Sequence, residues 1–164
     1  MDTIVLLGVV TGMRSMTAIA ALAWAAWLGL VPEYGWATWI AHLLAALIFS
    51  ICALGEYVVD TLPQTPRRTD LGPALFRVVV ASLVGAMVAK TIDEPLAGGI
   101  IFGAVGAIIG TWGGFFVRMT VARVFRRDLP AALLESASAI ALAVLALAKL
   151  HYGIVFDLKK AASF

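Results

Sequence analysis

Apolar and polar residues alternate in long blocks along this chain of 164 residues. A helix that crosses a bilayer needs about 20 mostly apolar residues, and five blocks are long enough. They cover residues 3–31, 36–60, 73–92, 96–120 and 130–151. The pattern predicts an all-α fold: a polytopic membrane helical bundle of about five transmembrane helices, forming a single integral membrane domain over residues 1–164.

The first block is longer than a single crossing requires, and polar residues interrupt it. The interruption is the stretch GMRSMT at residues 12–17, which lies between the apolar runs IVLLGVV and AIAALAWAAWLGLV. Discontinuous helices place backbone groups next to ligands inside membrane transporters. The sequence leaves three conformations open: a tilted continuous helix, a helix kinked near Thr11-Gly12, and a half-helix followed by a second helical piece.

Composition supports a membrane protein and excludes other classes. Apolar residues make up 62% of the chain and charged residues only 13%, with a mean hydropathy of +1.00, whereas soluble domains contain about 25% charged residues. A net charge of +2 is too small for a nucleic-acid-binding surface. The single cysteine, Cys52, excludes an internal disulfide and a thiol metal cluster. We expect no nucleic acid partner, no metal and no cofactor.

The arginines predict the orientation in the membrane. Arg67 and Arg68 lie between the second and third blocks, and Arg123, Arg126 and Arg127 follow the fourth. Positive residues concentrate in cytoplasmic loops, so both connections are predicted to be cytoplasmic. The N-terminus of this multi-pass membrane protein is then cytoplasmic. Membrane lipids are the expected partners, together with a second copy of the chain, because five spans are few to enclose a transport path.

Charged residues inside the apolar blocks are the candidates for function: Arg14, Glu56, Asp60, Arg118 and Glu135. A charge near the bilayer centre costs roughly 2.5–3.5 kcal/mol on insertion scales, so such residues tend to face partners or water. Glu56 and Asp60 share one helix face because they are four residues apart. Arg14 is about 11 residues into its block, equivalent to about 16 Å of helix. On the predicted topology, all of these charges fall in the cytoplasmic half of the bilayer.

Two interpretations of these charges stay open. In the first, Arg14 and Arg118 only neutralise the carboxylates and fix how the helices pack. In the second, the same residues line a pocket that water can reach, and they bind an ion, a proton or a lipid headgroup. Because intramembrane ionisable residues are functional candidates, the candidate substrate- or ion-binding residues are Arg14, Ser15, Thr17, Glu56, Asp60, Arg118 and Glu135.

Two further groups of residues are predicted to make contacts. Arg67, Arg68 and Thr69, in the proline-rich connection TLPQTPRRTDLGP, offer donors to phosphate or lipid headgroups. Glycines in the fourth block recur at steps of three and four and predict a smooth face for close helix packing. These glycines are Gly99, Gly103, Gly106, Gly110 and Gly113.

The stretches GMRSMTAIAALAW, GEYVVDTLPQTPRRT and GAVGAIIGTWGGFFVRMTVAR, followed by ALLES, together resemble the bacterial membrane-protein family called domain of unknown function 4126. The resemblance covers nearly the whole chain and implies a small helical, multi-pass protein of the bacterial cytoplasmic (inner) membrane without an established activity. The family pattern has Asp-Lys where this chain has Asp60-Thr61, and Glu-Asp where it has Glu135-Ser136. These departures weaken the case for a second acidic site on the fifth block.

A shorter resemblance, to undecaprenyl-pyrophosphate phosphatases and related polyprenyl-phosphate carriers, rests on Arg14-Ser15, Thr17, Glu56 and Asp60. Those proteins combine an Arg-Ser motif ending in threonine with two acidic residues four apart on a helix. The resemblance implies an enzyme or carrier that handles polyprenyl phosphates.

Three functions are therefore compatible with the sequence. The leading hypothesis is a transporter or channel-like protein, in which Arg14 binds an anion or anionic headgroup and Glu56 and Asp60 bind a proton or cation. The alternatives are the polyprenyl-phosphate enzyme or carrier, and a non-catalytic scaffold or assembly factor that docks through its glycine face. The chain has no Gly-x-Ser-x-Gly motif, and a non-enzyme is favoured.

Overall fold

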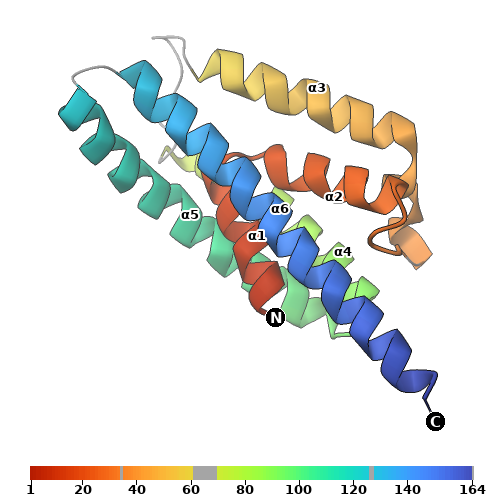
Figure 1. Ribbon diagram of the computed structural model, residues 1–164. Helices are drawn as coiled ribbons and strands as arrows, with labels where there is room; N and C mark the ends of the chain where they lie inside the picture. Colours follow the sequence, from red (N-terminus) through yellow and green to blue (C-terminus); the bar gives the residue numbers. More distant parts are fainter. Residues whose placement is uncertain (34, 61–69, 126–127, 164) are drawn as a thin grey trace.

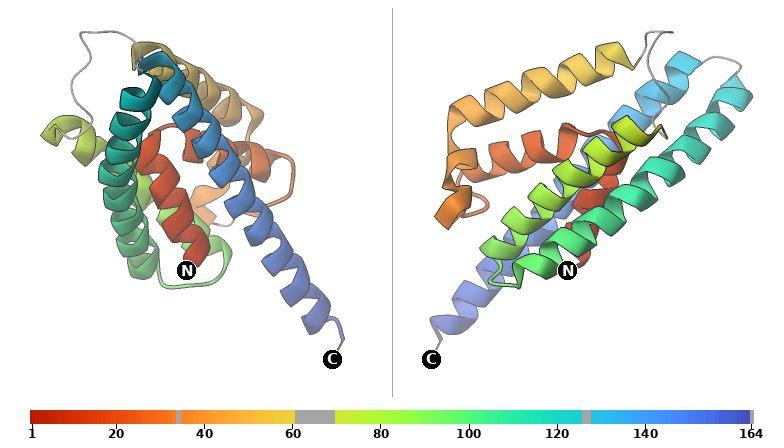
Figure 2. Two further views of the ribbon diagram at one scale, coloured as in Figure 1. Left: turned by 60° about the vertical axis from the view of Figure 1, so that its left-hand side comes forward. Right: turned by 180° about the vertical axis from the view of Figure 1, so that it is seen from behind.

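Figure 1 shows the computed structural model of the chain, in which residues 1–33, 35–60, 70–125 and 128–163 are described. These residues form helices and turns and contain no strand, as the predicted all-α fold requires. α1 lies at the centre and packs against α4, α5 and α6 (Figure 2). The elements in chain order are α1 (Asp2–Met13), α2 (Thr17–Trp27), the 3-10 helix η1 (Gly35–Ala41), α3 (Leu43–Val59), α4 (Leu71–Thr91), α5 (Leu96–Phe125) and α6 (Asp128–Ala161).

Within the described residues, three helices are long and apolar enough to cross a membrane: α4, α5 and α6. η1 and α3 are bent by 69° relative to each other, and they give a fourth span only if the bent pair is counted as one. The five predicted transmembrane helices are not confirmed, because the first apolar block forms two short helices of 12 and 11 residues.

The first apolar block is discontinuous, which is the third of the conformations that the sequence allows. α1 ends at Met13 and α2 begins at Thr17, and Arg14 between them has an extended backbone with φ −143° and ψ 106°. α2 then runs at an angle to α1 (Figure 1). A 12-residue helix is only about 18 Å long, little more than half of a hydrocarbon core about 30 Å thick. Neither piece can cross a membrane alone.

The α1–α2 hairpin begins and ends on the same side of the bundle. Asp2 pairs with Lys149 of α6 at 3.0 Å, and the carbonyl oxygen of Leu30, just after α2, lies 2.7 Å from Nδ1 of His151. We call this side the terminal end, because the C-terminus of α6 lies there as well (Figure 1). The opposite side, where α3 and α5 stop and α4 and α6 start, is the connection end.

The cytoplasmic position of the N-terminus stays a prediction, but the structure shows where the N-terminus lies relative to the helix ends. The side chain of Met1 packs beside Gly98, at the start of α5 and thus at the terminal end. α3 and α5 end at the connection end, and α4 and α6 begin there. The N-terminus and these helix ends therefore lie on opposite sides of the bundle. The physical reason is that the first block turns back at Arg14 instead of crossing.

Glycines allow α5 to approach α1 backbone to backbone. A methyl group at Gly106 would overlap the carbonyl group of Val5, and one at Gly110 would overlap the carbonyl group of Val9. In return, a methyl group at Gly12 of α1 would overlap a carbonyl group of α5. Only residues without a side chain permit this separation, so the glycines fix the depth at which α1 ends.

The same face of α5 also meets α4, but the glycine face stops earlier than predicted. Gly99 lies against Gly85, and a methyl group at Gly103 would overlap the carbonyl group of Ala81. Gly113, which the sequence assigns to the same packing face, has no neighbouring atom within 4 Å of its Cβ position. Gly113 is exposed on the outer surface of the bundle and makes no close helix contact.

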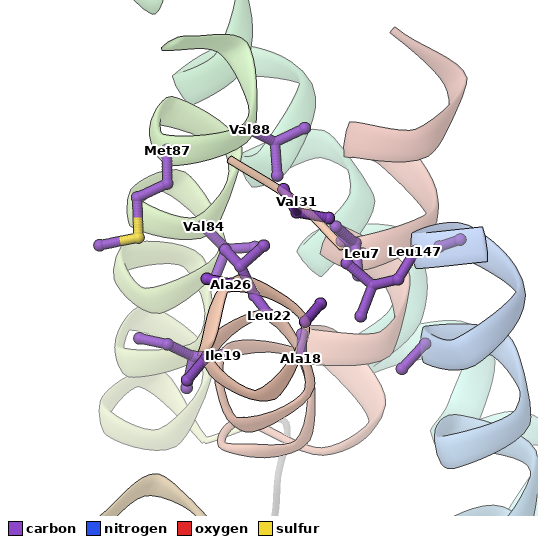
Figure 3. Close-up of a cluster of buried hydrophobic side chains, with 14 of the residues drawn as sticks. Leu7, Ala18, Ile19, Leu22, Ala26, Val31, Val84, Met87, Val88 and Leu147 are labelled. Atoms are coloured by element: carbon purple, nitrogen blue, oxygen red, sulfur yellow. The ribbon is translucent and has the colours of Figure 1, made fainter. Parts of the chain in front are cut away.

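An apolar core ties the hairpin to the long helices (Figure 3). It joins Ile19 and Leu22 of α2 with Leu7 of α1, Val84 of α4 and Leu147 of α6. In a membrane, van der Waals contacts between such side chains hold helices together, because lipid is as apolar as they are. α2 is therefore an integral part of the core, even though it is too short to span a membrane.

Glu33 is a buried acid at the terminal end, in the connection between α2 and η1 and outside the membrane-spanning helices. It is 9% exposed, and neither of its carboxylate oxygens has a hydrogen-bond partner among the described residues. The neighbouring Thr91 hydroxyl donates to the Met87 carbonyl oxygen at 3.1 Å. Burial raises the pKa of Glu33 to about 7. The site therefore favours the neutral carboxylic acid.

We expect Gly106→Ala to lower the free energy of unfolding by about 1–3 kcal/mol, since the added methyl group overlaps backbone atoms that cannot move cheaply. The measurement is thermal or sodium dodecyl sulfate denaturation of the detergent-solubilised protein. Gly113→Ala is the matched control, and it should leave stability unchanged or raise it by up to about 1 kcal/mol through helix propensity. Equal effects of the two substitutions would contradict the close packing of α1 on α5.

Glu33 predicts a loss of stability as the pH rises through neutrality. Its pKa is about 7 in the folded chain against a usual value of 4.5. Between these values the folded state holds a proton that the unfolded state releases, so the free energy of unfolding falls with rising pH. Glu33→Gln should abolish this fall and be more stable than wild type above pH 7, by on the order of 2 kcal/mol after allowing for partial solvation.

The measurement is thermal denaturation between pH 5 and pH 8, with Glu94→Gln, an exposed acid in the α4–α5 turn, as the control. An unchanged pH dependence in Glu33→Gln would show that Glu33 titrates normally.

Candidate functional site at the break between α1 and α2

The break between α1 and α2 exposes backbone groups that a continuous helix would pair. The last carbonyl groups of α1 and the first N–H groups of α2 lose their intrahelical partners. At the end of α1, the hydroxyl of Thr111 in α5 donates to the carbonyl oxygen of Gly12 at 3.3 Å, and the N–H of Arg14 still bonds the carbonyl oxygen of Val10 at 2.7 Å. The start of α2 needs a partner from elsewhere, because no side chain at its N-cap supplies one.

Glu56 supplies that partner from the last turn of α3. The N–H of Ser15 donates to Oε1 of Glu56 at 2.8 Å, and the N–H of Met16 donates to Oε2 at 2.9 Å. A carboxylate at this position also interacts favourably with the positive end of the helix dipole. The two oxygens of one carboxylate therefore occupy an anion site formed by the N-terminus of α2.

Arg14 lies beside this anion site and is the most deeply buried charge of the cluster, at 1% exposed. Its Nη1 pairs with the carboxylate of Asp60, one helical turn after Glu56. Its Nη2 donates to the carbonyl oxygen of Ala132 in α6 at 3.3 Å, and its guanidinium carbon lies 5.0 Å from the centre of the Tyr57 ring. Arg14 thereby links the break to both α3 and α6.

A second arginine, Arg77 of α4, reaches the same place. It is 4% exposed. Its Nε donates to the hydroxyl of Ser15 at 3.2 Å, and its Nη2 lies 3.7 Å from Oε1 of Glu56. On the other side, the hydroxyl groups of Thr17 and Tyr57 are 2.7 Å apart. We call the whole group the break cluster: Arg14, Ser15, Thr17, Glu56, Tyr57, Asp60 and Arg77.

Among the described residues, the break cluster brings two guanidinium groups to two carboxylates. Taking such charges out of water is expensive, and replacing a buried ion pair by apolar side chains is often neutral or stabilising. Removing one partner is different, because it leaves an uncompensated buried charge at a cost of about 3–5 kcal/mol. Stability alone therefore gives no reason for this cluster, and any change in the charge of one member must be compensated by another.

Arg118 and Glu135 form a separate ion pair on the far side of α1. Nη1 of Arg118 in α5 lies 3.7 Å from Oε2 of Glu135 in α6. Ala132, whose carbonyl group binds Arg14, is one turn before Glu135 on α6, so the pair lies at the same end of the bundle as the break cluster. The structure thus brings together Arg14, Ser15, Thr17, Glu56 and Asp60, and it places Arg118 and Glu135 in a second location.

Arg77 and Tyr57 belong to the site but are missing from the candidates that the sequence indicates. Arg77 carried a signal, because it is a charge within the first two turns of an otherwise apolar helix. Tyr57 carried none, since an aromatic residue in a membrane helix is ordinary. The headgroup candidates Arg67, Arg68 and Thr69 lie outside the described residues.

The donors and acceptors of the break cluster decide which kind of ligand it could bind. Both carboxylates already accept from N–H donors. Across the described ranges, no three His, Cys, Asp or Glu side chains are close enough to hold a metal ion. The donors, by contrast, are of the kind that recognises oxyanions: two guanidinium groups and two consecutive backbone N–H groups.

Comparisons with protein-family models, with curated proteins and with solved structures find no match to this chain. The resemblance to the family called domain of unknown function 4126 stays a prediction, and the function has to be argued from the break cluster itself.

Proposed function

We propose that the protein is a membrane transporter that binds an anion at the break cluster and couples its movement to a proton. The observation that supports this most directly is that the carboxylate of Glu56 accepts hydrogen bonds from two N–H groups that have no partner within the broken helix. In transporters, discontinuous helices often point their N-termini at anionic substrate groups. Glu56 occupies the position that such a group takes, and a substrate anion would replace it there.

The donors around Glu56 suit such a replacement. The N–H groups of Ser15 and Met16 belong to the backbone and keep their direction when Glu56 leaves. Arg77 lies 3.7 Å from Oε1 of Glu56, beyond the usual 2.7–2.9 Å of a charge-assisted hydrogen bond. A ligand in the place of Glu56 would lie within reach of Arg77, which also donates to the hydroxyl of Ser15, while Arg14 stays paired with Asp60.

Charge balance supplies the coupling to a proton. An entering anion adds a negative charge beside the carboxylates of Glu56 and Asp60. A proton on Glu56 would offset this charge and weaken the hold of this side chain on the helix N-terminus. Because each event favours the other, proton binding and anion binding are linked, and linkage is reciprocal.

We further propose four crossings of the bacterial cytoplasmic membrane, made by η1 with α3, by α4, by α5 and by α6. The arginine-rich segments favour a cytoplasmic connection end. Both termini then lie outside, and the hairpin enters from the outside and stops at the break cluster in the cytoplasmic half of the bilayer. Four crossings are few to enclose a path, which favours a homodimer.

A lipid-phosphate enzyme or carrier is the second candidate. The observation in its favour is that Arg14, Ser15, Thr17, Glu56 and Asp60, on which the shorter resemblance rests, lie in one cluster. It predicts release of phosphate from a polyprenyl pyrophosphate by the purified protein and loss of that release in Glu56→Gln. Absence of release from every lipid pyrophosphate would exclude the enzyme.

Transport predicts different effects for the two sides of the ion-pair network. Arg77→Gln removes an anion donor and should reduce uptake at least about tenfold, the equivalent of one lost charge-assisted hydrogen bond. Glu56→Gln removes the proton carrier, so uptake should continue but no longer respond to a pH gradient. The measurement is uptake of radiolabelled phosphate and succinate into liposomes containing the purified protein, with a trapped pH-sensitive dye.

Glu94→Gln is the matched control, because it makes the same chemical change in an exposed residue of the α4–α5 turn and should leave uptake and its pH dependence intact. Uptake equal to that of protein-free liposomes, or an undiminished pH response in Glu56→Gln, would rule out the proposed coupling.

A further inference from the structure

An apolar groove leads away from the break cluster along α2. It has a volume of about 340 Å³ and lies between α2, α3 and α6. Thr17 and Tyr57 line one end, Trp24 and Ser50 line the other, and small or apolar side chains such as Val144 lie between them. From Thr17 to Trp24 the groove follows two turns of α2, which is about 10 Å.

The two ends of the groove differ in chemistry. At the first end, the hydroxyl groups of Thr17 and Tyr57 are 2.7 Å apart, and the ring of Tyr57 also lies under the guanidinium group of Arg14. At the second end, Nε1 of Trp24 donates to the hydroxyl of Ser50 at 2.9 Å. Tyr57 therefore lines the groove and also belongs to the break cluster, so the groove ends beside the anion site.

The groove is open sideways to the surroundings of the bundle. α3 packs against α2 and η1, and Figure 2 shows it lying over α2 and away from the central helices. At the mouth, Leu54 of α3 is 62% exposed and Val144 of α6 is 58% exposed. In a membrane such side chains meet lipid, so a hydrocarbon chain could enter the groove from the bilayer without crossing a polar surface.

We propose that the anion is an amphiphile with one hydrocarbon chain, whose acidic head binds at the break cluster and whose chain lies in this groove. The inference rests on the proposed function and names its substrate class. Charge complementarity fixes the direction, because the cationic and N–H donors of the break cluster lie beyond the Thr17–Tyr57 end of the groove, whose own lining has no charged residue. A carboxylate or a phosphate head fits equally, since both offer at least two oxygens to the two N–H donors.

A second apolar groove does not have this polarity. It lies between α1, α5 and α6, with a volume of about 470 Å³, and its charged residues are Arg118 and Glu135. These two carry opposite charges and pair with each other, so the groove offers an acidic head no net attraction. The groove along α2 is therefore the better match for an acidic amphiphile.

Trp24 makes the proposal testable by fluorescence, because bromine on a bound chain quenches a tryptophan that it touches. The probe is 12-bromododecanoate added to the protein in phosphatidylcholine nanodiscs, and the Trp24 signal is the difference between wild type and Trp24→Phe. We expect saturable quenching of Trp24. Neutral 12-bromododecanol, which lacks the acidic head, should give only the weak, non-saturating quenching of a chain dissolved in the bilayer.

Two matched substitutions separate the groove from the bilayer. Val144→Phe fills the groove and should weaken the binding of 12-bromododecanoate at least about fivefold, as expected for the loss of one or two buried methylene groups. Leu145→Phe makes a similar change at the next position of α6, outside the groove lining, and should have no effect. Equal quenching by the acid and the alcohol, or equal effects of the two substitutions, would overturn the proposal.

The outcome also separates this inference from the proposed function. If uptake of phosphate and succinate depends on Arg77 but 12-bromododecanoate gives no saturable quenching, the amphiphile is wrong and anion transport stands. If quenching is saturable and Arg77→Gln abolishes it while no anion is taken up, the groove binds its amphiphile and transport is wrong.

Discussion

The carboxylate of Glu56 accepts the two backbone N–H groups that the break in the first apolar block leaves without a partner. Inside a membrane such groups cannot turn to water, and each unpaired one costs several kcal/mol. The α1–α2 hairpin therefore depends on α3, which brings Glu56 to the break. The same requirement links fold to function, because any ligand that displaces Glu56 must present oxygens to the same two donors or the hairpin loses its support.

The depth of the break follows from the packing of α1. Gly106 and Gly110 of α5 let the backbone of α1 approach until side chains would no longer fit. This contact fixes where a 12-residue helix ends within the bundle. Arg14 then lies opposite α6 and α3, and its charge is met by Asp60 and by the carbonyl group of Ala132. Small residues in one helix thus determine which polar groups meet in the others.

The sequence predicted much of the site and less of the path that the chain takes to it. The sequence alone predicts that Arg14 pairs with Glu56 or Asp60, because charged residues within a membrane tend to pair with residues of opposite charge. Arg77 was not among the predicted site residues, because it lies near the start of a helix, where an arginine side chain can reach the membrane interface and needs no partner. The direction of α2 could not be predicted either. A long apolar block has the same composition whether it crosses the membrane once or forms a re-entrant hairpin. Only core contacts, such as those of Leu22 with the long helices, decide between the two.

The α1–α2 hairpin begins and ends at the terminal end, and this affects how two copies of the chain could be joined. Both ends of the polypeptide emerge at one face of the bundle (Figure 1). With the four crossings proposed above, a short linker could join two copies head to tail, and the second copy would keep the orientation of the first. Duplication of such a chain would then yield parallel halves, in contrast to the inverted halves that arise when an odd number of crossings is repeated.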